Sequence, residues 1–188
     1  MSDFLPQNGN YRNLIAYQKA ECIYDVTFFF AHKYLGKGDR TIDQMIQAAR
    51  SGKQNIAEGS AASATSKETE IKLVNVAKAS MQELLVDYED YLRVRNLERW
   101  SDTDKRFLQT KEVAARHNDS EFYRQAIESR SDETIANIAI ILINQVDYLL
   151  FRLIERLKSD FLKNGGIREA MSQARKNYLN NNNKSKGH

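Results

Sequence analysis

The chain is organised around one polar stretch bounded by glycine, Arg50-Ser51-Gly52-Lys53-Gln54-Asn55-Ile56-Ala57-Glu58-Gly59. Apolar residues within it and before it recur at helical spacing, namely Ile42, Met45, Ile46, Ala49 and Ile56. The pattern predicts an amphipathic helix over about residues 41–59. Residues 60–64 either extend this helix or form a loop, and we favour a loop that Gly59 permits by a turn. We expect Gly52 to let a neighbouring helix or subunit approach closely.

Helix breakers are scarce along the whole chain, which has 188 residues, one proline and eight glycines. Three further periodic segments predict long helices over about residues 13–35, 66–97 and 132–163. Four long helices with mostly short connections favour an all-α, antiparallel up-down-up-down four-helix bundle over residues 11–163. An extra helical insertion, 101–131, lies between the third and fourth helices. A short C-terminal helix and a disordered basic tail are expected in 164–188.

The first and last long helices carry features that a simple bundle does not need. Two apolar stripes make the apolar face of the first helix unusually wide, so this helix is either central or partly covered by another subunit. The last helix is apolar nearly all round but includes Asn144, which either fixes register or oligomeric state or faces an exposed groove. Its uncharged window, Thr134 to Val146, spans about 20 Å as helix, short of a membrane core of about 30 Å.

The residues that could carry catalysis do not form a recognisable pattern. A di-iron bundle needs Glu three residues before His, but Phe29 precedes His32 and Ala114 precedes His117 at that spacing. Cys22 and His32 face different directions on one helix, and we expect Cys22 to be buried and His32 to be solvated. We therefore expect no catalytic, cofactor-binding or metal-binding residue, and not an enzyme. The N-terminus does not resemble a signal peptide, so a cytoplasmic location with no membrane contact is expected.

Positive charge is concentrated toward the C-terminus. The chain carries a net charge of +3, of which residues 163–188 contribute +5, leaving −2 for residues 1–162. Phosphate contacts require clustered cations, and the candidates are Arg40, Arg50, Lys53, Lys163, Arg168, Arg175 and Lys176. A second cluster, Arg93, Arg95 and Arg99, ends the third helix. The alternative for each group is an ordinary solvated charged surface.

Two segments carry a resemblance to a known family. Ser51-x-x-x-Asn55-Ile56-Ala57-Glu58-Gly59 and Val76-Ala77-Lys78-Ala79-Ser80-Met81-Gln82-Glu83-Leu84 resemble the bacterial four-helix-bundle family. That family includes proteins encoded in intervening sequences of large-subunit ribosomal RNA genes, and the accessory variability determinant of diversity-generating retroelements. The resemblance assigns a structural role to Ser51, Asn55, Glu58, Gly59, Ser80 and Glu83. Gly52 and the insertion depart from the family pattern, and Phe161 to Tyr178 looks like a suffix found on one subset.

The resemblance implies a non-enzymatic, cyclic homo-oligomer, often a pentamer, with RNA or DNA binding in some members and a reverse transcriptase as partner in others. The residues by themselves leave two functions open. One is a self-associating bundle that binds nucleic acid through its basic surface and tail. The other is a protein-interaction scaffold in which residues 165–178 dock as an amphipathic helix. Asn55 and Glu58 are expected to hold the end of the second helix in place, with a polar ligand contact as the alternative for Glu58.

Overall fold

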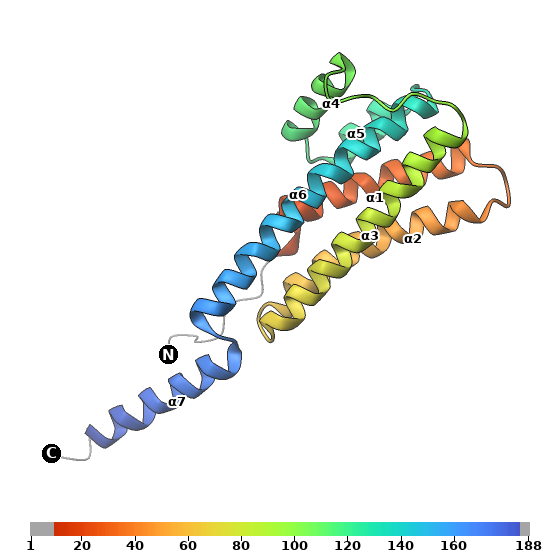
Figure 1. Cartoon of the computed structure of the whole chain (residues 1–188). Helices are drawn as coiled ribbons and strands as arrows, with labels where there is room; N and C mark the ends of the chain where they lie inside the picture. Colours follow the sequence, from red (N-terminus) through yellow and green to blue (C-terminus); the bar gives the residue numbers. More distant parts are fainter. Residues whose placement is uncertain (1–9, 185–188) are drawn as a thin grey trace.

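The computed structural model describes residues 10–184, and these residues are entirely helical apart from the connections between helices (Figure 1). The all-α prediction is therefore confirmed for this part of the chain. The elements are the short 3-10 helix η1 (Tyr11–Asn13), α1 (Ile15–Tyr34), α2 (Arg40–Ala62), α3 (Lys67–Val94), α4 (Lys105–Arg116), α5 (Ser120–Ile127), α6 (Asp132–Asn164) and α7 (Ile167–Lys184).

One apolar core is shared by the four long helices α1, α2, α3 and α6. Helices α2 and α6 each pack against both α1 and α3, so each helix of the four has two neighbours (Figure 1). The largest fully buried side chains at their centre include Ile23, Phe30, Met81, Leu84 and Leu142. Burial of such side chains stabilises a fold by roughly 1.5–3 kcal/mol each.

The ends of α2 differ from the predicted ends. The helix begins at Arg40, one residue before the predicted start, because the Asp39 side chain caps it by accepting a hydrogen bond from the Thr41 amide at 2.9 Å. At its other end α2 continues through Gly59 to Ala62. The expected turn at Gly59 was therefore wrong, and residues 60–62 of the expected loop are helical. The physical reason is burial, since Gly59 and Ser60 pack inside the structure.

Helix α6 is long and apolar enough over Asp132–Lys163 to cross a membrane, by length and composition alone. In its most apolar stretch 61% is buried inside the protein, as in the core helix of a soluble protein. Asn144 is exposed on α6 and lines a groove between α1, α4 and α6. Of the two roles predicted for Asn144, this position fits a residue that faces an exposed groove and not a buried amide that fixes helix register.

Helix α7 projects away from the other helices (Figure 1). It runs to Lys184, so the structure continues the helix through residues 180–184, which the sequence assigned to a disordered tail. The rest of that tail, residues 185–188, lies outside the described residues. Two apolar side chains on α7, Met171 and Tyr178, are more than half exposed.

The insertion covers α1, which explains why α1 is apolar over so wide a face. Helix α5 packs against α1, and α4 packs against α6. Lys19 lies under the insertion with 4% of its surface exposed, and its ammonium donates to the carbonyl of Ala114 and, at 3.5 Å, to that of His117. These carbonyls belong to the C-terminal end of α4, where the helix dipole favours a cation. Burial lowers the pKa of the Lys19 amine.

Cys22 lies one turn beyond Lys19 and is fully buried, as expected from the sequence. Burial raises the pKa of its thiol from 9.0 to about 12. The thiolate, which is the reactive form, is therefore disfavoured in the folded chain.

The raised pKa of Cys22 predicts a loss of stability in alkaline solution. The unfolded chain releases the thiol proton above pH 9 and the folded chain holds it to about pH 12, so the unfolded state is favoured between these values. At pH 10 this loss is about 1.4 kcal/mol. The contribution of the thiol is isolated by denaturant unfolding of the native chain and of Cys22→Ala at pH 7.5 and pH 10, because all other titrating groups are the same in the two chains. From pH 7.5 to pH 10 the free energy of unfolding of the native chain should fall by that amount relative to Cys22→Ala. An unchanged difference between the two chains would contradict the burial of the thiol.

Candidate functional site

The stretch from Ser51 to Gly59 lies where α2 packs against α3. The hydroxyl oxygens of Ser51 and Ser80 are 2.9 Å apart and form a hydrogen bond between the two helices. The Asn55 amide nitrogen donates to the Ser51 carbonyl at 2.9 Å and contacts the Ser51 hydroxyl at 3.3 Å. Three residues of the sequence motif thus form one polar cluster at a helix–helix contact, where they join structural elements.

Two glycines allow α2 and α3 to approach each other along the same contact. A Cβ atom at Gly52 would lie 2.5 Å from Cε of Met81, and a Cβ atom at Gly59 would lie 3.3 Å from Cγ2 of Val74. The close approach expected at Gly52 is therefore present, and Gly59 has the same role instead of the turn. Glu58 and Glu83 are exposed, and among the described residues neither forms a hydrogen bond or ion pair.

The predicted cations on α2 are free to meet an external anion. Arg40 and Arg50 are exposed, whereas Lys53 is half-buried with its ammonium 4.5 Å from the centre of the Tyr24 ring. Within the described part of the chain, none of the three forms an ion pair. The cluster at the end of α3 differs, because Arg93 is paired with Asp90 at 2.8 Å and Arg99 with Glu89 at 2.7 Å, while Arg95 covers the Tyr91 ring.

The C-terminal cations lie at the other end of the molecule. Lys163, Arg175 and Lys176 are exposed and have no ion pair with a described residue. The Arg168 side chain lies outside the described residues. Helix α2 begins at the end of the molecule opposite to α7 (Figure 1), so within one chain Arg40 and the cations of α7 do not form one continuous surface.

Several buried polar contacts were not foreseen from the sequence. The Tyr88 hydroxyl donates to Thr27 at 3.0 Å, and the Tyr91 hydroxyl donates to Asp132 at 2.8 Å. Burial raises the pKa of both phenols, so they act as neutral donors. Their spacing on the inner stripe of α3 was visible in the sequence, but their hydrogen-bond partners lie on other helices and could not be read from it.

The histidines and acids do not assemble into a metal site in the part of the chain that the structure describes, where no group of three or more His, Cys, Asp or Glu residues could hold an ion. His32 is exposed, and its Nδ1 atom lies 2.8 Å from the Phe28 carbonyl oxygen on the preceding turn. The prediction that His32 is a solvated residue agrees with this position.

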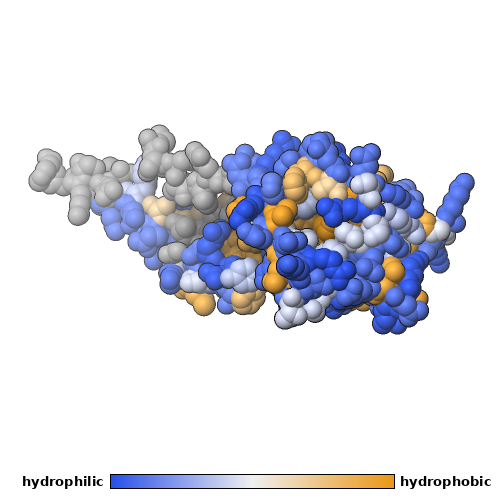
Figure 2. Space-filling model, turned by 90° about the horizontal axis from the view of Figure 1, so that it is seen from above, coloured by the Kyte–Doolittle hydropathy of each residue, from blue (hydrophilic) through white to orange (hydrophobic). Residues whose placement is uncertain are grey.

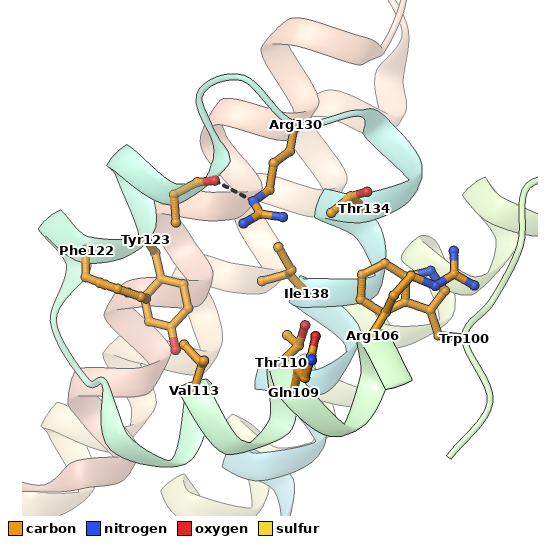
Figure 3. A pocket seen from close by; sticks show the side chains of 11 residues that line it. Trp100, Arg106, Gln109, Thr110, Val113, Phe122, Tyr123, Arg130, Thr134 and Ile138 are labelled. Atoms are coloured by element: carbon orange, nitrogen blue, oxygen red, sulfur yellow. Dashed lines mark hydrogen bonds between the residues drawn. The ribbon is translucent and has the colours of Figure 1, made fainter. Parts of the chain in front are cut away.

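A small pocket lies between α4, α5 and the start of α6, and sequence analysis did not foresee it (Figure 3). Its volume is about 330 Å³, and its walls include Trp100, Tyr123 and Ile138. The backbone amide of Trp100 is fixed by the buried side chain of Asn137, whose Oδ1 accepts its proton at 2.9 Å. The pocket therefore belongs to the insertion and to the helix that follows it, and not to the α2–α3 contact.

Comparisons with known proteins do not assign the chain to a family. No protein-family model, no curated protein and no solved structure matches this sequence.

The close approach at Gly52 predicts a large effect of a small substitution. Gly52→Val should destabilise the fold by about 1–3 kcal/mol, because the new side chain would overlap buried Met81. In a Met81→Ala background the same substitution should cost less, which denaturant unfolding measures as a coupling energy. Gly36→Ala is the matched control, since a Cβ there meets no atom within 4 Å. Equal stability of Gly52→Val and the native chain would show that the helices do not meet at this point.

Proposed function

We propose that this protein is a non-catalytic, self-associating member of the bacterial four-helix-bundle family, and that it binds RNA or DNA through cations that have no ion-pair partner among the described residues. The observation that carries the proposal is the contrast between neutralised and unpaired cations. Arg93 and Arg99 are held by carboxylates, whereas Arg50 on α2 and Arg175 and Lys176 on α7 are exposed and unpaired within the described residues.

The bundle assignment is supported by which helices touch. Helices α1 and α3 each contact α2 and α6, as neighbours do in an antiparallel up-down-up-down four-helix bundle. The chain reverses at residues 35–39 and again at residues 63–66, two short connections that suit antiparallel neighbours. The motif residues Ser51, Asn55 and Ser80 act at the α2–α3 contact, in agreement with the structural role that the resemblance assigns to them.

Self-association requires an apolar surface, and on the face seen in Figure 2 hydrophobic residues form patches among hydrophilic ones. Helix α5 packs against α1, which keeps Ile15 and Phe28 about half exposed. Further exposed apolar side chains lie on α3, at Val76 and Val86, and on α6, at Tyr148 and Phe151. Because the surfaces of α3 and α6 differ, a contact between α6 of one copy and α3 of the next is head-to-tail, and such contacts form a ring when the rotation between copies closes. A pentamer is the ring that the family resemblance favours.

A ring would bring the nucleic-acid proposal and the assembly proposal together. Each copy would repeat the unpaired cations of α2 and α7 around the ring, so that weak individual contacts to one strand of nucleic acid would add. The cytoplasm is the compartment proposed for such an assembly.

The second candidate function is a protein-interaction scaffold without a nucleic-acid role. The observation that favours it is the exposed apolar side of α7, which includes Met171, Tyr178 and Leu179. An amphipathic helix that stands clear of its own chain can lie in the groove of another protein, including a reverse transcriptase.

The assembly proposal predicts the effect of one charge on α6. Phe151→Glu places a carboxylate on the exposed stripe of α6 and should shift the protein toward monomer in sedimentation equilibrium at micromolar concentration, with its melting temperature almost unchanged. Leu108→Glu is the matched control, because Leu108 is equally exposed but lies on α4. A native chain that is monomeric under these conditions would end the proposal.

The nucleic-acid proposal predicts how binding depends on salt. Loss of one phosphate contact should reduce the slope of log K against log salt concentration by about 0.7–0.9, and Arg50→Ala and Arg175→Ala should each do so. Arg93→Ala is the control, since its guanidinium is already paired with Asp90. Fluorescence anisotropy with mixed-sequence RNA and DNA measures these slopes. Equal slopes for Arg50→Ala and Arg93→Ala would contradict the assignment of the unpaired cations.

A further inference from the structure

The pocket between α4, α5 and α6 contains a positive charge that the described chain leaves without a counter-ion. Arg130 donates from Nε to the Ala126 carbonyl at 2.7 Å, and this bond orients its guanidinium. In Figure 3 the two terminal nitrogens of Arg130 extend into the pocket above Ile138. The neighbouring arginines are neutralised, because Arg106 binds Asp104 and Glu98 and Arg124 binds Glu121. The Arg106 guanidinium also lies 3.9 Å from a carboxylate oxygen of Glu133. Arg130 is exposed and has no ion pair among the described residues, so it is the cation of this pocket that an external anion can pair with.

The other walls of the pocket are mainly apolar and aromatic. Phe122 and Tyr123 stand on one side and Trp100 on the other, while Thr110 reaches up from α4 opposite Arg130 (Figure 3). Trp100 is only 7% exposed, and its indole N–H is buried without a hydrogen-bond acceptor among the described residues. A buried donor without an acceptor is rare in native proteins. Because this N–H has almost no accessible surface, Trp100 offers the pocket its apolar ring and no hydrogen-bond donor.

The size and charge of the pocket restrict what it can hold. A volume of about 330 Å³ lies at the lower end for ligand pockets and excludes a folded partner. A guanidinium presents two parallel N–H groups that match the two oxygens of a carboxylate. Glu98, Asp104 and Glu133 surround Arg106, which also lines the pocket. A monoanion therefore meets less repulsion there than a phosphate dianion.

We propose that this pocket binds a small organic monocarboxylate with a flat or branched apolar body. The carboxylate lies against Arg130, and the apolar body lies on Ile138 between the aromatic walls. The site does not depend on nucleic acid or on assembly, because its walls come from the insertion and from α6 of a single chain.

The chain provides its own reporter for the experiment, since Trp100 is its one tryptophan and lines the pocket. The full chain is titrated with benzoate, phenylacetate and 3-methylbutanoate while the fluorescence of Trp100 is recorded. Benzamide and phenylacetamide are the uncharged controls, and inorganic phosphate is the anion control. We expect a saturable change with at least one carboxylate and a dissociation constant at least about 10-fold weaker for its amide.

Three variants test the assignment of residues. Arg130→Gln should weaken binding of the carboxylate at least about 10-fold, and Arg130→Lys, which keeps the charge without the planar fork, should have a smaller effect. Arg124→Gln is the matched control, because Arg124 is paired with Glu121 and does not line this pocket. If Arg130→Gln melts at a lower temperature, Thr110→Leu replaces it, since it fills the pocket from α4 and leaves the cation in place.

Several outcomes would overturn the proposal. They are no saturable response to any carboxylate up to about 10 mM, equal affinity for carboxylate and amide, tighter binding of phosphate, and equal loss of binding in Arg124→Gln and Arg130→Gln.

Discussion

Gly52 and Gly59 lie on the face of α2 that packs against α3, and at Gly52 a single added carbon would overlap Met81. Here α2 meets α3, and α3 in turn contacts α6 and α1. The Lys78–Asp147 ion pair at 2.6 Å joins α3 to α6, and the hydrogen bond from Tyr88 to Thr27 joins α3 to α1. Glycine at position 52 therefore matters because it leaves room for the buried side chain of Met81.

The insertion changes which surfaces remain available for a function. By packing α5 against α1 it covers part of the wide apolar face that the sequence offered for assembly, and it buries Lys19 at the C-terminal end of α4. A buried cation whose hydrogen bonds go to backbone carbonyls stabilises the position of α4, because each helix carbonyl there lacks a partner within α4. The exposed apolar stripes of α3 and α6, the unpaired cations of α2 and α7, and the pocket beside Arg130 are left as the surfaces with which the protein can act.

Much of the fold could be predicted from the sequence because it depends on local periodicity. The helical periodicity over about residues 66–97 located α3, which spans Lys67–Val94. The continuation of α2 through Gly59 could not be predicted, since it depends on Val74 and Glu70 of another helix covering the glycine. Glycine marks a helix end and a close contact equally well, and only the packing distinguishes them.

The candidate sites were less predictable from the sequence, because they too depend on contacts between different helices. Whether an arginine is available to an external anion depends on carboxylates that other turns or helices bring near it, as Arg99 and Glu89 show. The pocket beside Arg130 depends on three helices and on a tryptophan in the connection between α3 and α4. The burial of Lys19 did have a signal in the sequence. Lys19, Cys22 and Val26 repeat at helical spacing, which places a lysine on a buried stripe of α1.

The central claim is that a self-associating helical core displays α7 as a basic arm that binds nucleic acid. The most direct measurement compares the complete chain with a chain ending at residue 163, by light scattering and by binding to mixed-sequence RNA at low salt, where non-specific contacts are strongest. The account predicts that the shorter chain keeps the mass of the assembly and loses most of its affinity for RNA. Equal affinity for RNA with and without α7, or no affinity in either chain, would contradict it.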